Sequence, residues 1–455
     1  MKTWSKKLIS VLKILKYPLA FLVLPLVVGI SSFLLTTTSP PAPQLEQAYP
    51  AAPKLDPNKP TVAVVLARDM TEVADVLAPY AVFKTSSAFN VILVSEQRRP
   101  LTLSGNLDVI PHFSFAELDI ALGHDPDLIV IPNIPNVAAN EALRLWVQRH
   151  GRGRSLVMSV CAGAAMFAAT GLIDGLPATT HWGDMTWIEP TYPKVKWLRG
   201  QRYVDNGQFI STAGILSGID GSLHMIDRLR GTNLAMQVAK KLHYPTQYLE
   251  NPSMEQFYFA PRDAILLLNG LFRWDRANMG VALVDGIDEL ALAAVYDTYA
   301  PSFTAQLVSI APPGTVITSK HGLNLVARRT PQQWATDREI MLPGSGEDLQ
   351  VPAWLKPYRV KYTLAGTNQF PFNLALENLA QDQNIPTAEF AAKRLEYRFL
   401  PGQLQGAGWW TLAVVYRPLW LGLLALALVY GLERFERRNP NTSQKQPASM
   451  NQPAA

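Results

Sequence analysis

The sequence predicts an α/β protein whose core is a parallel sheet covered by helices on both faces. Between residues 60 and 245, short continuous apolar stretches alternate with helical patterns. Strands that are apolar throughout indicate a sheet buried on both faces, and the alternation with helices indicates parallel crossover connections. Two long apolar segments, one near each end of the chain, add a pair of predicted transmembrane helices.

The predicted strands and helices follow one another in regular order. The strands are 61–67, 90–95, 127–132, 155–160 and 208–214, and the helices are 71–84, 138–149 and about 217–229. Thr71 is the expected N-terminal cap of the first helix. In parallel sheets ligands bind beyond the carboxyl ends of the strands, so residues that directly follow strands are the first candidates for a site.

Composition limits the classes of function. The 455 residues are 48% apolar and carry a net charge of +5, and the single cysteine excludes an intrachain disulfide. Residues 1–36 contain five lysines and no acid, and residues 433–455 contain four basic and two acidic side chains, which leaves −2 for the middle of the chain. The basic character therefore belongs to the two ends, and no basic patch indicates nucleic-acid binding.

The two apolar segments define a membrane topology. Residues 18–35 form the first, and we favour an anchor over a cleaved signal peptide because no small-x-small site follows. Residues 409–432 form the second, for which a buried soluble helix is the alternative. Lysines before the first span and arginines after the second place both termini in the cytoplasm. The globular part is then extracytoplasmic, which in a bacterium means periplasmic.

The remaining segments read as linkers and tails. Residues 37–60 are rich in proline and predict a stiff, extended linker. Residues 246–276 connect two α/β regions, and residues 433–455 form a polar tail that we expect to be disordered.

Cys161 is the most informative single residue. It follows the apolar run 155–160 and precedes small residues that open a helix, so it lies at a sharp strand-to-helix turn. A helix N-terminus favours thiolate over thiol, and the thiolate is the nucleophilic form. A buried structural cysteine is the alternative.

Four ordered motifs resemble the ThiJ/PfpI superfamily, which has a class I glutamine-amidotransferase-like, flavodoxin-like fold. They are the first helix with an acid four residues before a proline, the cysteine elbow, a segment ending in Thr-Thr-His-Trp, and the last strand and helix. These motifs stand at 72–83, 159–165, 172–182 and 211–224. The last two resemble the branch that contains isocyanide hydratase and the amidase-like domains of AraC-type regulators. The resemblance covers about residues 60–245.

The resemblance implies roles for particular residues. Cys161 matches the nucleophile, and Asp75 matches an acid that lies against the cysteine and should have a raised pKa. The alternative for Asp75 is a solvated carboxylate on a helix face. His181 matches a histidine near the pocket, with a satisfied core or surface histidine as its alternative.

The chain departs from the family pattern at three points. Ala162 follows the cysteine, where the protease-like branch has histidine. Asn133 and Ile134 replace a Gly-Gly pair whose amides face an oxyanion, so the expected pocket amides belong to Asn133, Ile134 and Ala162, with Thr212 nearby. No helix-turn-helix module follows the domain, which argues against DNA binding.

Residues 277–400 restart the pattern as a second, degenerate lobe. Val281 falls on Val62 at a constant offset, Ala294 stands in place of Asp75, and the motif at 392–397 echoes that at 239–244. We expect this lobe to be an internal pseudo-dimer partner of residues 60–245, with chance similarity between α/β segments as the alternative.

No phosphate-binding loop, HExxH motif or cysteine cluster occurs, so we expect neither a cofactor nor a metal. The leading hypothesis is a membrane-anchored enzyme in which Cys161 attacks a small electrophile, such as an amide, isocyanide or carbonyl, with Asp75 as general acid and base. The alternatives are a non-catalytic sensor or ligand-binding module that signals through the membrane helices, and a scaffold for a membrane complex. The sequence names no ligand or substrate.

Overall fold

The structure is a computed structural model that describes residues 2–37, 40–45, 48–344, 351–362, 369–397 and 403–438. The chain divides into two compact units. The smaller unit contains the first 38 residues, Leu268–Trp274 and the chain from Thr411 onward, and the larger unit contains the remainder. Most of the predicted tail, residues 439–455, lies outside the described residues.

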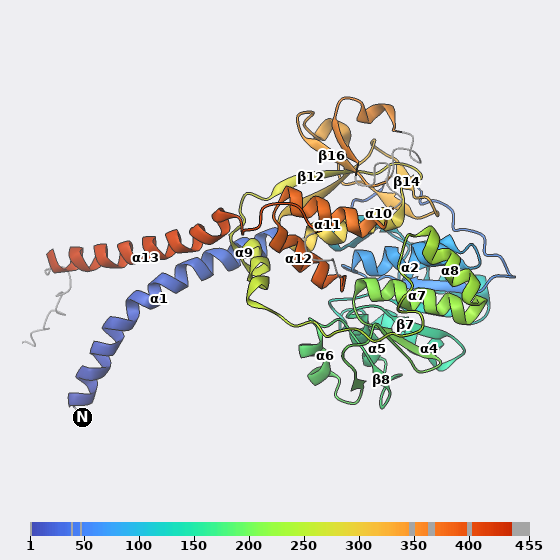
Figure 1. The fold of residues 1–455 in the computed structure, drawn as a ribbon, viewed down its shortest axis with the longest axis horizontal. Helices are drawn as coiled ribbons and strands as arrows, with labels where there is room; N and C mark the ends of the chain where they lie inside the picture. Colours follow the sequence, from blue (N-terminus) through green and yellow to red (C-terminus); the bar gives the residue numbers. More distant parts are fainter. Residues whose placement is uncertain are drawn as a thin grey trace, which may run out of the picture. The chain divides into compact units, whose positions relative to one another are not determined.

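The larger unit is built on a seven-stranded sheet (Figure 1). Its strand order is β10-β11-β7-β6-β1-β2-β5. The strands are β1 (Thr61–Val65), β2 (Asn90–Ser95), β5 (Phe113–Ser114), β6 (Leu128–Ile131), β7 (Leu156–Ser159), β10 (Tyr203–Asp205) and β11 (Phe209–Thr212). All five predicted strands are present. The sheet is mixed rather than wholly parallel, because a tight turn at Gly207 folds the edge strand β10 back against β11.

Helices cover both faces of this sheet, as predicted. Helices α2, α7 and α8 lie on one face and α4 and α5 on the other (Figure 1). Helix α3 lies beside α4. Their bounds are α2 (Val73–Thr85), α3 (Phe115–Leu122), α4 (Glu141–Arg152), α5 (Gly163–Ala169), α7 (Ile215–Arg230) and α8 (Thr232–Lys241).

The expected cap of the first helix is wrong. The hydroxyl of Thr71 accepts a hydrogen bond from the Ala67 amide (3.0 Å) and does not cap α2. The Val73 amide instead donates to the hydroxyl of Ser104 (2.9 Å), which lies between β3 (Leu101–Leu103) and β4 (Leu107–Ile110). The first turn of α2 is thus held by a hairpin that local sequence does not place there.

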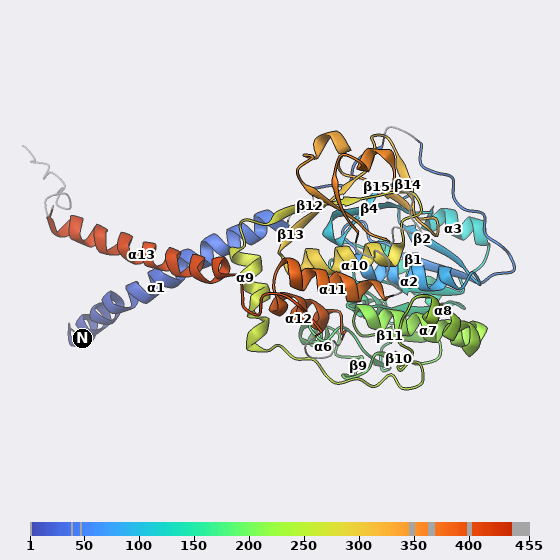
Figure 2. The ribbon, with the colours of Figure 1, turned by 45° about the horizontal axis from the view of Figure 1, so that its top comes forward.

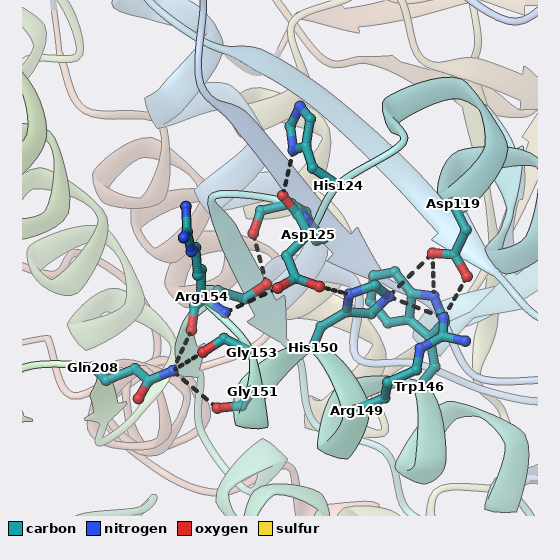
Figure 3. A network of polar contacts seen from close by, with 12 residues as sticks. Asp119, His124, Asp125, Trp146, Arg149, His150, Gly151, Gly153, Arg154 and Gln208 are labelled. Atoms are coloured by element: carbon teal, nitrogen blue, oxygen red, sulfur yellow. Dashed lines mark hydrogen bonds and ion pairs between the residues drawn. The ribbon is translucent and has the colours of Figure 1, made fainter.

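A polar network fixes the start of the strand that leads to Cys161 (Figure 3). His150, near the end of α4, contacts Asp125 through Nδ1 (2.7 Å) and Asp119 through Nε2 (3.0 Å). Asp125 also accepts a hydrogen bond from the Arg154 amide (2.9 Å), and Gln208 donates to the Gly151 carbonyl (2.9 Å). These bonds tie the segment before β7 to its neighbours. They fix the start of β7, which is the end of the strand opposite Cys161.

The region 277–400 forms a second sheet with strand order β13-β12-β16-β17. The strands are β12 (Ala277–Ala282), β13 (Ala305–Ile310), β16 (Glu339–Leu342) and β17 (Arg359–Tyr362), and all pair in parallel. This is the arrangement of β2-β1-β6-β7 in the main sheet. Helix α10 (Glu289–Tyr299) follows β12 as α2 follows β1, and α10 packs against α2 (Figure 2).

The two regions share a third sheet and a buried ion pair. This sheet has the order β14-β15-β4-β3, where β14 (Val316–Thr318) and β15 (Asn324–Val326) come from the second region. Antiparallel pairing joins β15 to β4. Beside it, Arg328 Nε lies 2.7 Å from the buried carboxylate of Asp108. A backbone ladder and a charge pair therefore connect the two regions.

The final helices of the two regions end in the same way. The second region closes with α11 (Pro371–Asp382) and α12 (Ile385–Arg394). After α8, His243 has a φ of 52°, and after α12, Glu396 has a φ of 56°. The next residue bonds back in both cases, from Tyr244 to Ala239 and from Tyr397 to Ala392. The echo seen in the sequence thus corresponds to one local backbone conformation.

The smaller unit contains two helices long and apolar enough to cross a membrane, α1 (Lys2–Thr37) and α13 (Leu412–Arg438). Arg417, inside α13, donates to the carbonyl of Phe272 (2.7 Å), at the end of α9 (Ala264–Phe272). The region 246–276 is therefore not only a connector, because its last part packs with the two long helices. Residues 433–438 of the predicted tail are helical.

Candidate cysteine site

Cys161 stands at the elbow between β7 and α5. Its φ is 55°, a left-handed conformation that is costly for a side chain other than glycine. Gly163, two residues later, lies so close to β6 that an added Cβ would stand 2.6 Å from the Pro132 carbonyl oxygen. The strained turn and the glycine together give the elbow that the sequence predicted. The thiol is almost completely buried.

Asp75 lies in the first turn of α2 and is fully buried. Its Oδ2 accepts a hydrogen bond from the Asn133 amide (3.0 Å), whereas Oδ1 has no partner among the described residues. Burial, and after it the charge of Glu72, raises the pKa of Asp75 well above its ordinary value. The raised pKa favours the neutral form of the Asp75 carboxyl, which retains one oxygen for a further contact.

The environment of Cys161 favours the thiol over the thiolate. Burial is the main cause that raises the pKa of Cys161 well above its ordinary value, and the charges of Asp75 and Asp184 act in the same direction. The sequence argument relied on the N-terminus of the following helix, but α5 has only seven residues. Burial and nearby carboxylates outweigh that effect.

His181 is close to the thiol but has no free nitrogen. A nitrogen of its ring, the sulfur of Cys161 and a carboxylate oxygen of Asp184 lie within 4.8 Å of one another. Nδ1 contacts Asp184 Oδ2 (3.0 Å), and Nε2 contacts the Arg394 carbonyl oxygen (3.0 Å). Both nitrogens face acceptor oxygens, and neither makes a hydrogen bond to the thiol.

The same three side chains are the group among the described residues whose atom types and spacing suit a metal ion. The ligand atoms of His181 and Asp184 are already engaged, however. The second carboxylate oxygen of Asp184 accepts from Trp187 Nε1 (2.9 Å), and both nitrogens of His181 are bonded as described. The arrangement favours a hydrogen-bonded cluster over a metal centre.

The amides expected to face an oxyanion are only partly available. The Asn133 amide is used by Asp75, so it cannot serve a bound ligand at the same time. No hydrogen bond joins the amides of Ile134 or Ala162 to another described residue. Thr212 is buried with its methyl group against Gly221 of α7. Ile134 and Ala162 are therefore the remaining donors of this kind.

Arg394, the last residue of α12, is a member of the site that the sequence did not indicate. Its guanidinium lies 2.9 Å from Asp297 and 3.4 Å from Glu72. Burial raises the pKa of Glu72, but the charge of Arg394 and several hydrogen bonds lower it by more, so the pKa of Glu72 lies below its ordinary value. The positive charge likewise opposes the raised pKa of Cys161. The only sequence signal is the echo at 392–397.

The segment Lys393–Glu396, here named the closing segment, lies beside the site and bonds to the domain that carries it. The carbonyls of Lys393 and Arg394 accept from Trp182 Nε1 (3.1 Å) and His181, and that of Leu395 accepts from the Leu216 amide (3.4 Å). The carboxylate of Glu396 accepts from the Gly214 amide (2.6 Å) and the Ser217 hydroxyl. Each residue of the closing segment therefore bonds to the domain that carries Cys161.

Residues 60–227 match the sequence model of the DJ-1/PfpI family. An α/β sheet with a cysteine at the elbow after a central strand is the expected setting for such a domain. The chain thus carries a DJ-1/PfpI family domain, and the family resemblance drawn from the four motifs is confirmed at that level.

The relatives are distant. Isonitrile hydratase of Pseudomonas putida is 28% identical over 173 residues, which are 37% of this chain and 72% of that protein. The HTH-type transcriptional regulator CdhR of Pseudomonas aeruginosa is 30% identical over 107 residues, 24% of this chain and 32% of the regulator. The chain therefore spans about a third of that regulator's length.

Among solved structures, a DJ-1 superfamily protein of Salmonella typhimurium is 23% identical, with a TM-score of 0.37, and the match covers 41% of this chain and 99% of that one. An AraC family transcriptional regulator of Pseudomonas putida is 16% identical, with a TM-score of 0.33, over 40% of this chain and 98% of that one.

Proposed function

We propose that the globular part is a ligand-responsive module at the outer face of a membrane, in which the closing segment keeps the thiol of Cys161 covered. One observation carries this proposal: every residue of Lys393–Glu396 bonds to the domain that contains the cysteine. A site that turns over substrate needs access to its nucleophile. A site sealed by its own chain is suited to respond when the seal opens.

The second region, residues 277–400, acts in this proposal as an internal partner of the first. The shared strand order, the packing of α10 on α2 and the common sheet through β4 and β15 support it. Arg394 from this region supplies the charge that lies between two carboxylates beside Cys161. A fixed internal partner would hold the site closed at any protein concentration.

The membrane placement is part of the proposal. Helices α1 and α13 pack against each other. Tyr17, in the first half of α1, donates to Glu433 in the last half of α13 (3.0 Å), so the two helices run antiparallel. Antiparallel spans put both chain ends on one side, and the flanking lysines and arginines favour the cytoplasmic side. The module would then signal through these two helices.

The test is the alkylation rate of Cys161 by iodoacetamide in the full chain, held in lipid nanodiscs. The chain has one thiol, so the label reports one site. We expect labelling at least 100-fold slower than in the same chain unfolded in urea. Labelling within a few-fold of the unfolded rate would show an open thiol and would overturn the closed-module proposal.

Hydration of an isonitrile is the second candidate function. The strained elbow at Cys161, the unpaired oxygen of Asp75 and the similarity to isonitrile hydratase favour it. The reaction adds water across the terminal carbon and nitrogen and gives an N-substituted formamide. The full chain would be incubated with a small alkyl isonitrile and the formamide followed by NMR. Formamide production that Cys161→Ala abolishes would support this candidate, and no production above the Cys161→Ala background would reject it.

A further inference from the structure

We propose that a cavity beside the cysteine site binds a small, flat, uncharged ring compound. The cavity has a volume of about 270 Å³ and lies between the start of α6 (Met185–Thr191) and the segment 254–259. Cys161 does not line it. This inference deepens the proposed function, on which it partly rests, because it names the class of ligand to which the module would respond.

Aromatic side chains form the walls. Trp182 stands 4.8 Å from Phe259 and 6.2 Å from Phe257, measured between ring centroids. Met185 and Met254 add flexible thioethers, which pack well against ring edges. Walls of this kind offer offset or edge-on contacts to a planar ring. A small flat ligand fits them better than a branched aliphatic one.

Three polar side chains of the lining already have partners. The hydroxyl of Thr179 donates to the Leu198 carbonyl (2.9 Å), and that of Thr180 donates to the Cys161 carbonyl (3.0 Å). The guanidinium of Arg199 lies 2.6 Å from the carboxylate of Glu189. A charged ligand would have to compete with this ion pair for the charged partner of opposite sign. The lining therefore selects an uncharged compound.

The size of the cavity limits the ligand. Sites for drug-sized molecules measure roughly 300–1,000 Å³. A cavity of about 270 Å³ is suited to one ring or two fused rings.

Two hydrogen bonds connect this cavity to the closing segment. Trp182, a wall of the cavity, donates through Nε1 to the Lys393 carbonyl (3.1 Å). His181, its neighbour, contacts the Arg394 carbonyl (3.0 Å). A ligand that shifts the indole would change the first bond and thereby the closure over Cys161. Occupancy of the cavity and protection of the thiol are thus expected to be coupled.

The binding test uses fluorobenzene, with ¹⁹F NMR line broadening on the full chain in nanodiscs and empty nanodiscs as the background. We expect saturable broadening, and binding of 4-fluorobenzoate at least tenfold weaker. Thr186→Trp places a large side chain at a lining position, and Thr191→Trp makes the same change at an exposed position of the same helix. The first variant should bind at least tenfold more weakly and the second as the parent does.

Fluorobenzene broadening that is not saturable, or that is equal in the parent and Thr186→Trp, would overturn the cavity proposal. If Thr186→Trp does not fold, Phe257→Ala removes one wall and should also weaken binding at least tenfold. Alkylation of Cys161 at saturating fluorobenzene is the separate readout of coupling, and a change of threefold or more supports it. Saturable binding with an unchanged alkylation rate of Cys161 would confirm binding in the cavity and reject its coupling to the closing segment. Slow alkylation of Cys161 without fluorobenzene binding would reject the cavity proposal and leave the closed-module proposal in place.

Discussion

Replacing Arg394 by methionine should release the closing segment. The change removes the positive charge between Asp297 and Glu72, while the methionine retains much of the apolar volume. The carboxylate of Asp297 is buried and that of Glu72 is 12% exposed, and in the parent the charge of Arg394 lowers the pKa of each. Without it, two acids that cannot easily be ionised remain in the interior.

The expected magnitude follows from measured losses of one partner of a buried ion pair, which are about 3–5 kcal/mol. Each 1.36 kcal/mol corresponds to a factor of about ten, so the opening that exposes Cys161 should become on the order of 100- to 5,000-fold more frequent. Part of the loss will be relieved because burial already raises the pKa of Asp297, and this residue can take up a proton. The lower end of the range is therefore expected.

The effect should also depend on pH. A carboxyl whose folded pKa is raised is protonated in both states at low pH and costs nothing there, and its cost grows as the pH rises from the unfolded pKa to the folded pKa. Arg394→Met should therefore have a larger effect at pH 8 than at pH 5. Each rate is divided by the rate of the urea-unfolded chain at the same pH, which removes the titration of the thiol itself.

The assay is alkylation of Cys161 by iodoacetamide in the full chain in nanodiscs. Arg262→Met is the matched control, because this arginine pairs with Glu389 on the same helix α12 at the surface, where a pair contributes about 0–1 kcal/mol. The double variant Arg394→Met/Asp297→Asn should be alkylated at least tenfold more slowly than Arg394→Met alone. Less than threefold acceleration in Arg394→Met, or equal acceleration in Arg262→Met, would refute the argument.

Two further predictions concern the elbow and its acid. Because the folded pKa of Asp75 is raised, the contribution of this residue to stability is present at low pH and is lost as the pH rises through that pKa. The thermal midpoint should therefore fall less between pH 5 and pH 8 in Asp75→Asn than in the parent. An equal fall in the two proteins would contradict this prediction. Gly163→Ala should destabilise the domain by about 2 kcal/mol or more, because the added methyl group would overlap backbone carbonyls of the neighbouring strand, and a midpoint unchanged within 1 °C would contradict that packing.

The strands, the elbow and the two apolar helices were predictable because their signals are local. Continuous apolar runs indicate strands buried on both faces, and the small residues after Cys161 indicate a tight turn into a helix. The family resemblance added Asp75, whose burial the structure describes. The helix cap at Thr71 was wrong because Ser104, thirty-one residues after Val73, makes that hydrogen bond.

What the tertiary structure decided is the state of the site. Local sequence left open a reactive thiolate at a helix N-terminus and a buried structural cysteine, and burial with neighbouring carboxylates raises the pKa of Cys161. Arg394 reaches the site from the second region, and no local pattern around it carries that information. Charge interactions and desolvation depend on which groups share a buried volume, and only the packing of distant segments determines that. The sequence alone thus determined which residues could react, and the fold determined that they are covered.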